Sequence, residues 1–296
     1  MKKEKLSLAL FPLTTCSGCE NAILDSWSKI PESFIENIEI VYSPLISDSV
    51  EPNRVDIGIV TGSLRLNEDV DKLFRWRNKS KILIAFGSCS CFGGLPGLLN
   101  VYNVSDTIVE IYGENIDFNT YNLPKLIEYV KPVSEIVSVD IMVPGCPPPE
   151  KFILSLIGNL IENKPFQLID KSLCFECPLN INEIKTIKEL RRFLLPKIKV
   201  EKCFLEDGVL CLGIVTRCGC EAKCIRANTP CRGCLGSLYD VDEAAVKFLS
   251  SIASSLSISE IEIGKFNEVK DLIGFLYRYT LPLSKFASRN RGLRNE

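Results

Sequence analysis

The sequence predicts an α/β fold in which a doubly wound parallel sheet is followed by a cysteine-rich part and a helical tail. In the first half, continuous Val, Ile and Leu runs alternate with stretches of helical spacing. This alternation is typical of strands buried on both faces and of the helices that connect them. In the second half, cysteine is dense and strong periodicity is scarce, so this part offers little apolar core.

The expected elements follow one another in the order that such a sheet needs. Short, continuous apolar runs predict strands at 5–13, 38–45, 55–62, 81–89 and 137–146. Apolar residues at helical spacing predict helices at 19–30, 67–79 and 150–163. Asn67 is the expected N-cap of the second helix. The long and less regular stretch 98–136 is expected to be an insertion.

The second half has few regular elements. Between residues 164 and 240 only 180–195 has helical spacing, so something other than a large apolar core must hold this part together. Helical character returns at 243–256. The sequence therefore predicts three parts: 1–163, 164–240 and 241–296.

Composition excludes several classes of function. The net charge of −2 is spread over both signs, without the basic stripe of a nucleic-acid-binding protein. No apolar run reaches 18 residues, so no membrane span is expected. The start MKKEKLSLALFPL superficially resembles a signal peptide, but Glu4 interrupts the basic residues and no A-x-A site follows. A cytoplasmic location is expected, where thiols stay reduced.

Sulfur chemistry dominates the candidate sites, because the chain has fourteen cysteines and no histidine. Zinc sites often use histidine, whereas iron–sulfur clusters are held mainly by thiolates. Disulfides are the alternative use, in an oxidising compartment or in a hyperthermophile. With 46% hydrophobic residues, the chain does not need disulfides to replace a core.

Four cysteines lie near the carboxyl ends of three expected strands. Cys16 and Cys19 follow the first strand, and Cys89 and Cys146 lie at the ends of the fourth and fifth. These ends share one edge of a doubly wound sheet, where such folds bind ligands, so the thiols are expected to form a set suited to a [4Fe–4S] cluster. In a flavodoxin-like fold the first of these loops would hold a phosphate. Each cysteine alone could equally be a small buried hydrophobe.

Several residues around these cysteines have expected roles. Glycines beside them would let the backbone approach a cluster closely: Gly18, Gly87, Gly93 and Gly94. Glu20 has two interpretations that remain open. It is either an acid in the first turn of a helix, stabilised by the helix dipole, or a group that moves protons near the cluster.

Eight further cysteines form two sets of four. The compact set is Cys220, Cys224, Cys231 and Cys234, and the second set is Cys174, Cys177, Cys203 and Cys211. The compact spacing matches neither the bacterial ferredoxin run nor a zinc ribbon, whose cysteine pairs lie about fifteen residues or more apart. Cys91 and Cys218 are left over. Each lies two residues from an assigned ligand, so an exchange at either position is open.

The motifs together resemble the small subunit of a [NiFe] hydrogenase over nearly the whole chain. They are, in order, CSGCE, GSCSCFGG, VPGCPPPE, CFEC, CFLEDGVLCLG, CGCEAKC, PCRGC and YRYTLP. The chain is most similar to the cytoplasmic branch, with its F420-reducing, viologen-reducing and sulfhydrogenase types. The resemblance implies a flavodoxin-like domain (1–163), an iron–sulfur domain (164–240) and a helical tail (241–296).

The resemblance also implies which cysteines hold which cluster. The proximal set would be Cys16, Cys19, Cys89 and Cys146. The medial set would be Cys220, Cys224, Cys231 and Cys234, and the distal set Cys174, Cys177, Cys203 and Cys211. Cys174 stands where periplasmic enzymes usually have a histidine ligand. Cys224 stands near the position where many of those enzymes have a proline and a three-iron medial cluster. Both departures imply three [4Fe–4S] clusters here.

By the same resemblance, the nickel–iron active site belongs to a separate large subunit. This chain would then carry no catalytic residue apart from a possible proton relay at Glu20. It would conduct electrons between that site and an acceptor subunit, a flavin or iron–sulfur protein, during H2 oxidation or proton reduction.

Two alternatives share part of the pattern. The small cluster-bearing subunit of NADH–quinone oxidoreductases resembles the first half, but typically has adjacent cysteines in its first motif and lacks the second half. CSGC and the eight later cysteines favour the hydrogenase. The other alternative is a zinc-stabilised module with no redox role.

Overall fold

The computed structural model describes residues 5–114, 120, 122–180, 187, 190–192, 200–239, 241, 243–255 and 269–285. The chain divides into two compact units. The first consists of Met1–Gln167 and Tyr279–Glu296, and the second is Leu168–Arg278. The three-part division expected from the sequence stays a prediction.

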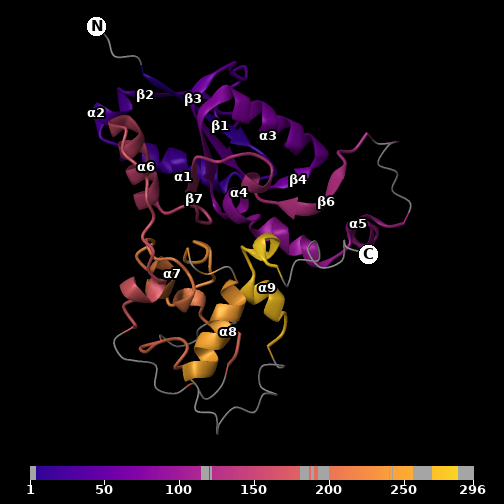
Figure 1. Ribbon diagram of the computed structural model, residues 1–296, viewed down its shortest axis with the longest axis vertical. Helices are drawn as coiled ribbons and strands as arrows, with labels where there is room; N and C mark the ends of the chain where they lie inside the picture. Colours follow the sequence, from indigo (N-terminus) through magenta and orange to yellow (C-terminus); the bar gives the residue numbers. More distant parts are fainter. Residues whose placement is uncertain are drawn as a thin grey trace. The chain divides into compact units, whose positions relative to one another are not determined.

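The first unit is built on a five-stranded parallel sheet in the order β2-β1-β3-β5-β7 (Figure 1). The strands are β1 Leu6–Pro12, β2 Ile38–Tyr42, β3 Val55–Thr61, β5 Ser80–Phe86 and β7 Ile141–Val143. Counted within this sheet, the order is 2-1-3-4-5, that of flavodoxin-like doubly wound folds. The predicted fold class is therefore confirmed.

β2, β5 and β7 each end three residues earlier than predicted. β5 stops at Phe86, because Gly87 takes a φ of +91° and turns the chain into the short helix α4, Ser88–Phe92. β7 is only three residues long. Cys89 and Cys146 consequently lie beyond their strands rather than in them.

Helices cover both faces of the sheet (Figure 1). On one side, α1 (Gly18–Trp27) packs against α6 (Glu150–Glu162), with the short helix α2 (Glu32–Ile35) beside it. On the other side, α3 (Asn67–Lys79) packs on β3 and β5. There Phe11 stacks on Trp76 with 4.8 Å between the ring centroids, within a buried apolar cluster.

The N-cap prediction for α3 was wrong by one residue. Leu66 occupies the N-cap, and Asn67 is the first helical residue. The Asp69 carboxylate supplies the cap instead, because its Oδ2 accepts the Leu66 N–H at 2.9 Å and the Thr14 hydroxyl at 3.0 Å. The Asp69 carboxylate, in the first turn of α3, thus takes the capping role that was expected of the Asn67 side chain.

The stretch 98–136, expected to be an insertion, contains regular elements. They are the end of η1 (Leu95–Val101), then α5 (Val104–Tyr112), β6 (Leu126–Lys131) and η2 (Val133–Glu135). β6 pairs antiparallel with β4 (Leu64–Leu66) in a separate two-stranded sheet. The sequence did not predict this pair.

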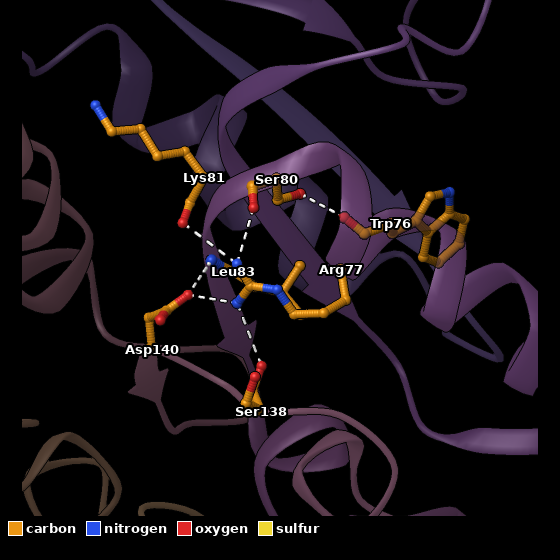
Figure 2. Close-up of polar contacts among 7 residues, drawn as sticks. All are labelled: Trp76, Arg77, Ser80, Lys81, Leu83, Ser138 and Asp140. Carbon is orange, nitrogen blue, oxygen red and sulfur yellow. Dashed lines mark hydrogen bonds and ion pairs between the residues drawn. The ribbon is translucent and has the colours of Figure 1, made fainter.

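A polar network joins α3 to the edge of the main sheet (Figure 2). Asp140, just before β7, accepts the Leu83 N–H at 2.7 Å and Arg77 Nη1 at 2.5 Å. The Arg77 guanidinium also donates to the carbonyl of Ser138 at 3.3 Å and to that of Ser80 at 2.8 Å. These contacts attach β7 where its ladder with β5 is short.

The second unit has short elements and a small core. The elements are η3 Leu173–Glu176, η4 Leu212–Ile214, α7 Lys223–Arg226, α8 Ala244–Ser255 and α9 Leu272–Leu276. Fully or nearly fully buried apolar residues include Phe204, Leu210 and Phe248. The remaining short element, η6 (Leu281–Leu283), belongs to the first unit.

The helix predicted at 243–256 is confirmed as α8. The helix predicted at 180–195 falls largely on residues outside the described ones. At Arg191, which is described, the backbone instead forms a β-bridge to Val209, so that prediction was wrong there. Within the described ranges, no helix combines the length and the apolar character that crossing a membrane requires.

Candidate metal centres

Three loops at the carboxyl edge of the parallel sheet carry the first four cysteines. Cys16 and Cys19 follow β1, beside the point where the strand order reverses, while Cys89 lies in α4 and Cys146 follows β7. Burial raises the pKa of Cys19 well above its ordinary value, and the Glu20 carboxylate and the three other thiols add to it. Burial likewise raises the pKa of Cys89 to about 11, with contributions from Cys146 and Cys16. The structure thus brings these four thiols together.

Glycines leave room beside two of these sulfurs. A Cβ on Gly87 would lie 2.4 Å from Cys19 Sγ, and a Cβ on Gly94 would lie 2.5 Å from Cys89 Sγ. Both glycines have a positive φ, which a side chain would also disfavour. Gly93, expected to make room for a cluster, instead makes room for Pro282, whose Cγ would lie 2.3 Å from its Cβ.

The YRYTLP segment returns to this site. The Tyr279 carbonyl accepts the Gly94 N–H at 3.2 Å, and Leu281 is fully buried. Burial, and then Cys16, raise the pKa of Cys146. A hydrogen bond donated by the Tyr279 hydroxyl lowers that pKa in part. Tyr279 had no predicted role, because its partners lie far away along the chain and no spacing signals the contact.

Glu20 lies in the first turn of α1, as both interpretations of it require, and is 2% exposed. Its Oε1 accepts the Thr61 hydroxyl at 2.6 Å. Its Oε2 is buried and has no hydrogen-bond partner among the described residues. This position fits both interpretations of Glu20, and both stay open.

In the second unit, Cys174, Cys177, Cys203 and Cys211 are close enough to affect one another's ionisation. Burial raises the pKa of Cys174 to about 11, and Cys177 and Cys203 add to it. The pKa of Cys211 is raised to about 12, mainly by burial. The backbone N–H groups of Gly213 and Cys231 lower this pKa, whereas Cys203 and Cys174 raise it further. Gly213 lies between two of these sulfurs, since its missing Cβ would be 3.6 Å from Cys211 Sγ and 3.8 Å from Cys174 Sγ.

The compact set is arranged as two pairs, and one of them is linked to the previous set. Burial raises the pKa of Cys220 most, and Glu176 and then Cys224 raise it further. Burial raises the pKa of Cys231 well above its ordinary value, and Cys211 adds more to it than Cys234 does. The Cys231 N–H also donates to Cys211 Sγ at 3.3 Å.

The two leftover cysteines are buried. Cys91 Sγ donates to the Ala85 carbonyl at 3.2 Å inside the apolar cluster next to α3. Burial and the Glu176 carboxylate raise the pKa of Cys218. All fourteen cysteines are described, and no disulfide joins any of them in the structure.

No three His, Cys, Asp or Glu side chains in the described ranges are arranged to hold a single metal ion. A zinc ion would need its sulfur ligands about 2.3 Å from one centre.

Comparison with known proteins connects both units to one family. A family model described as NADH ubiquinone oxidoreductase, 20 Kd subunit, matches residues 16–160. A vhu subunit of the F420-non-reducing hydrogenase of Methanocaldococcus jannaschii is 34% identical over 288 residues, which are 94% of this chain and 95% of that protein. The chain belongs to the family of these hydrogenase subunits. The resemblance to a hydrogenase small subunit is therefore confirmed.

Other members and neighbours agree with this assignment. A further relative, the iron-sulfur subunit of the F420-non-reducing hydrogenase of Archaeoglobus profundus, is 28% identical, covering 94% of this chain and 96% of that protein. The solved [NiFeSe] hydrogenase of Desulfovibrio vulgaris Hildenborough shares the fold, with a TM-score of 0.54 at 15% identity over 80% of this chain and 95% of that chain. The oxidoreductase model ends at residue 160, whereas the F420-non-reducing hydrogenase subunits also match the cysteine-rich part.

Proposed function

We propose that this chain is the iron–sulfur electron-transfer subunit of a [NiFe] hydrogenase. It conducts electrons between a nickel–iron site in a separate large subunit and an acceptor subunit, during H2 oxidation or proton reduction. The observation that carries this proposal is that loops at the carboxyl edge of the sheet bring Cys16, Cys19, Cys89 and Cys146 close enough to affect one another's ionisation, with Gly87 and Gly94 leaving room beside the sulfurs of Cys19 and Cys89. Membership of the hydrogenase subunit family supports it.

The donors suit iron–sulfur clusters. Twelve of the fourteen cysteines make up the three proposed sets of four. Within the set of Cys16 and the set of Cys174, the thiols are close enough to affect one another's ionisation. We assign the proximal [4Fe–4S] cluster to Cys16, Cys19, Cys89 and Cys146, the medial one to Cys220, Cys224, Cys231 and Cys234, and the distal one to Cys174, Cys177, Cys203 and Cys211. When bound, such clusters supply one-electron redox chemistry. The chain contributes burial and hydrogen bonds to the sulfurs, as at Cys211 and Cys146.

Glu20 is the candidate for proton movement next to the proximal set. The Thr61 hydroxyl holds Oε1, which leaves the buried Oε2 as the atom that can take up a proton.

The partners follow from the same proposal. A large subunit meets the proximal set, and a flavin or iron–sulfur acceptor subunit meets the distal set. Cluster-binding thiolates suit a reducing compartment, so we place the complex in the cytoplasm.

Metal analysis tests this function. The chain, purified anaerobically from its native complex, is expected to contain about twelve irons and as many labile sulfides, because three cubanes of four irons are proposed. Iron, sulfide, zinc and nickel are measured on the same sample. Stoichiometric zinc with little iron would support the zinc-stabilised module and sink the proposal.

A further inference from the structure

One carboxylate joins the two cysteine sets of the second unit. Glu176 lies between the two cysteines of CFEC, in the distal set. Its Oε1 accepts the N–H of Gly219 at 2.9 Å and the N–H of Ala222 at 3.3 Å. These two residues flank Cys220, the first cysteine of the medial set. A side chain of one set therefore holds the backbone of the other.

The backbone of the 218–222 loop is held in an unusual conformation. Glu221 and Ala222 both have left-handed backbone angles, with φ of 58° and 52°, and Gly219 has a φ of 117°. Non-glycine residues persist in such conformations only where surrounding contacts hold them. The N–H groups of Gly219 and Ala222, three residues apart in this loop, both donate to the same Glu176 oxygen, which therefore helps to hold the loop in this conformation.

A second contact links the same two sets from the other side. The Cys231 N–H donates to Cys211 Sγ at 3.3 Å, and the Leu212 N–H donates to the Cys231 carbonyl at 3.0 Å. This link is made by backbone groups and sulfur, so it does not depend on Glu176. The loop around Cys220, in contrast, is attached to the distal set through the Glu176 side chain.

We propose that Glu176 is a positioning residue that holds Cys220 in place for the medial cluster and attaches this loop to the distal set. The inference rests on the proposed function and deepens it. It also has an electrostatic consequence, because a carboxylate beside the medial ligands disfavours an added electron there. Loss of the charge, with the geometry kept, should raise the reduction potential of the medial cluster.

Two substitutions in the native complex separate geometry from charge. Glu176→Gln keeps an acceptor oxygen for both N–H groups, so it is expected to keep the iron content of the wild type and to shift the medial potential upward. Glu176→Ala removes the acceptor, so it is expected to lose about a third of the iron, one cluster of three, together with the medial signal. Iron analysis and an EPR-monitored redox titration measure both effects.

Glu206→Gln is the matched control. It removes a negative charge beside Cys203 of the distal set, which lies outside the 218–222 loop. It is expected to retain all its iron and the medial potential of the wild type. A medial shift equal to that of Glu176→Gln would mean that any nearby charge suffices, and would contradict a specific role for Glu176.

The outcomes distinguish this inference from the proposed function. A wild-type chain without three clusters defeats the proposed function. With three clusters present, the inference is overturned if Glu176→Ala keeps its iron and its medial signal, or if Glu176→Gln loses as much iron as Glu176→Ala. If Glu176→Ala fails to fold, Glu176→Gln decides alone, and an unchanged medial potential then overturns the inference.

Discussion

Single residues decide how closely the backbone can approach the proximal sulfurs. Gly87→Ala would place a carbon atom where only 2.4 Å separates it from Cys19 Sγ, at a φ of +91°. We expect this variant to lose about a third of its iron, since one cluster of three depends on Cys19. Iron and labile sulfide per chain, measured on the anaerobically purified complex, check the expectation.

Gly113→Ala is the control for backbone strain. Gly113 has a φ of +87°, close to that of Gly87, but its missing Cβ meets no atom within 4 Å in the described part of the chain. Its substitution should cost about 1–3 kcal/mol of stability and leave the iron content unchanged. Equal iron loss in both variants would show that backbone conformation, rather than space beside the sulfur, explains the effect.

The residue scale also shows which site features could be predicted. Strand ends and spacing placed Cys16, Cys19, Cys89 and Cys146 in one expected set, and these four thiols affect one another's ionisation in the structure. Strand ends and spacing could not decide between Cys89 and Cys91, because this depended on the helix α4, in which residues two apart point about 200° away from each other. Cys91 accordingly faces the core and donates to a carbonyl there. Tyr279 also escaped prediction, since nothing local marks a contact between distant segments.

At the scale of elements, the attachment of β7 positions the fourth proximal cysteine. β7 is three residues long and pairs with β5 alone, and Cys146 follows it closely. The Asp140 carboxylate, bound by Arg77 and the Leu83 N–H, adds contacts at the start of this strand (Figure 2). A defect in this network should therefore reach the cluster site through β7.

Asp140→Asn tests the charge in this network. Burial acts to raise the pKa of Asp140, but the Leu83 N–H and Arg77 together lower it below its ordinary value of 3.8. The stability that this carboxylate contributes is therefore present above about pH 4 and is lost as the pH falls through the lower folded-state pKa. The side chain is 45% exposed, so we expect a loss of only about 1 kcal/mol at pH 7.

Urea unfolding of wild type and variant at several pH values measures the difference. Whatever acid does to the rest of the protein affects both proteins alike, so the difference between them should shrink below about pH 4. A difference that is the same at every pH would assign the loss to packing rather than to charge.

Elements were predicted where a long pattern supported them. Long apolar runs were sufficient to predict β1, β3 and β5, and helical spacing was sufficient to predict α3 and α6. β4 and β6 were missed because a three-residue strand carries no periodicity, and its partner follows more than fifty residues later. The early end of β5 was missed because it is set by the backbone angle of one glycine.

At the scale of the whole molecule, the cysteine motifs are spread over both units, which is why the family resemblance covered nearly the whole chain. In the proposed assignment, the first unit carries the proximal set and the second carries the other two. The order of the sets along an electron path follows from the proposed function. It can be tested by interrupting the path in the middle.

Cys231→Ala is the substitution that interrupts it most cleanly. It removes a buried thiol of the medial set, but the N–H that donates to Cys211 Sγ belongs to the backbone and is retained. The proximal loops are untouched, so the variant should still assemble with its large subunit. Exchange of H2 with D2O requires no net removal of electrons, whereas reduction of the acceptor does. We therefore expect acceptor reduction to fall at least about tenfold, a barrier increase of about 1.4 kcal/mol, with most of the exchange kept.

Cys218→Ala is the matched control, since it also removes a buried thiol from the second unit but belongs to no assigned set. It should keep both activities and the full iron content. Exchange by mass spectrometry and acceptor reduction are measured on matched complexes. If Cys231→Ala reduces the acceptor at the wild-type rate, the medial set lies off the electron path. If it abolishes exchange in an intact complex, the medial set acts on the chemistry at the nickel–iron site, and conduction alone does not describe what this subunit does.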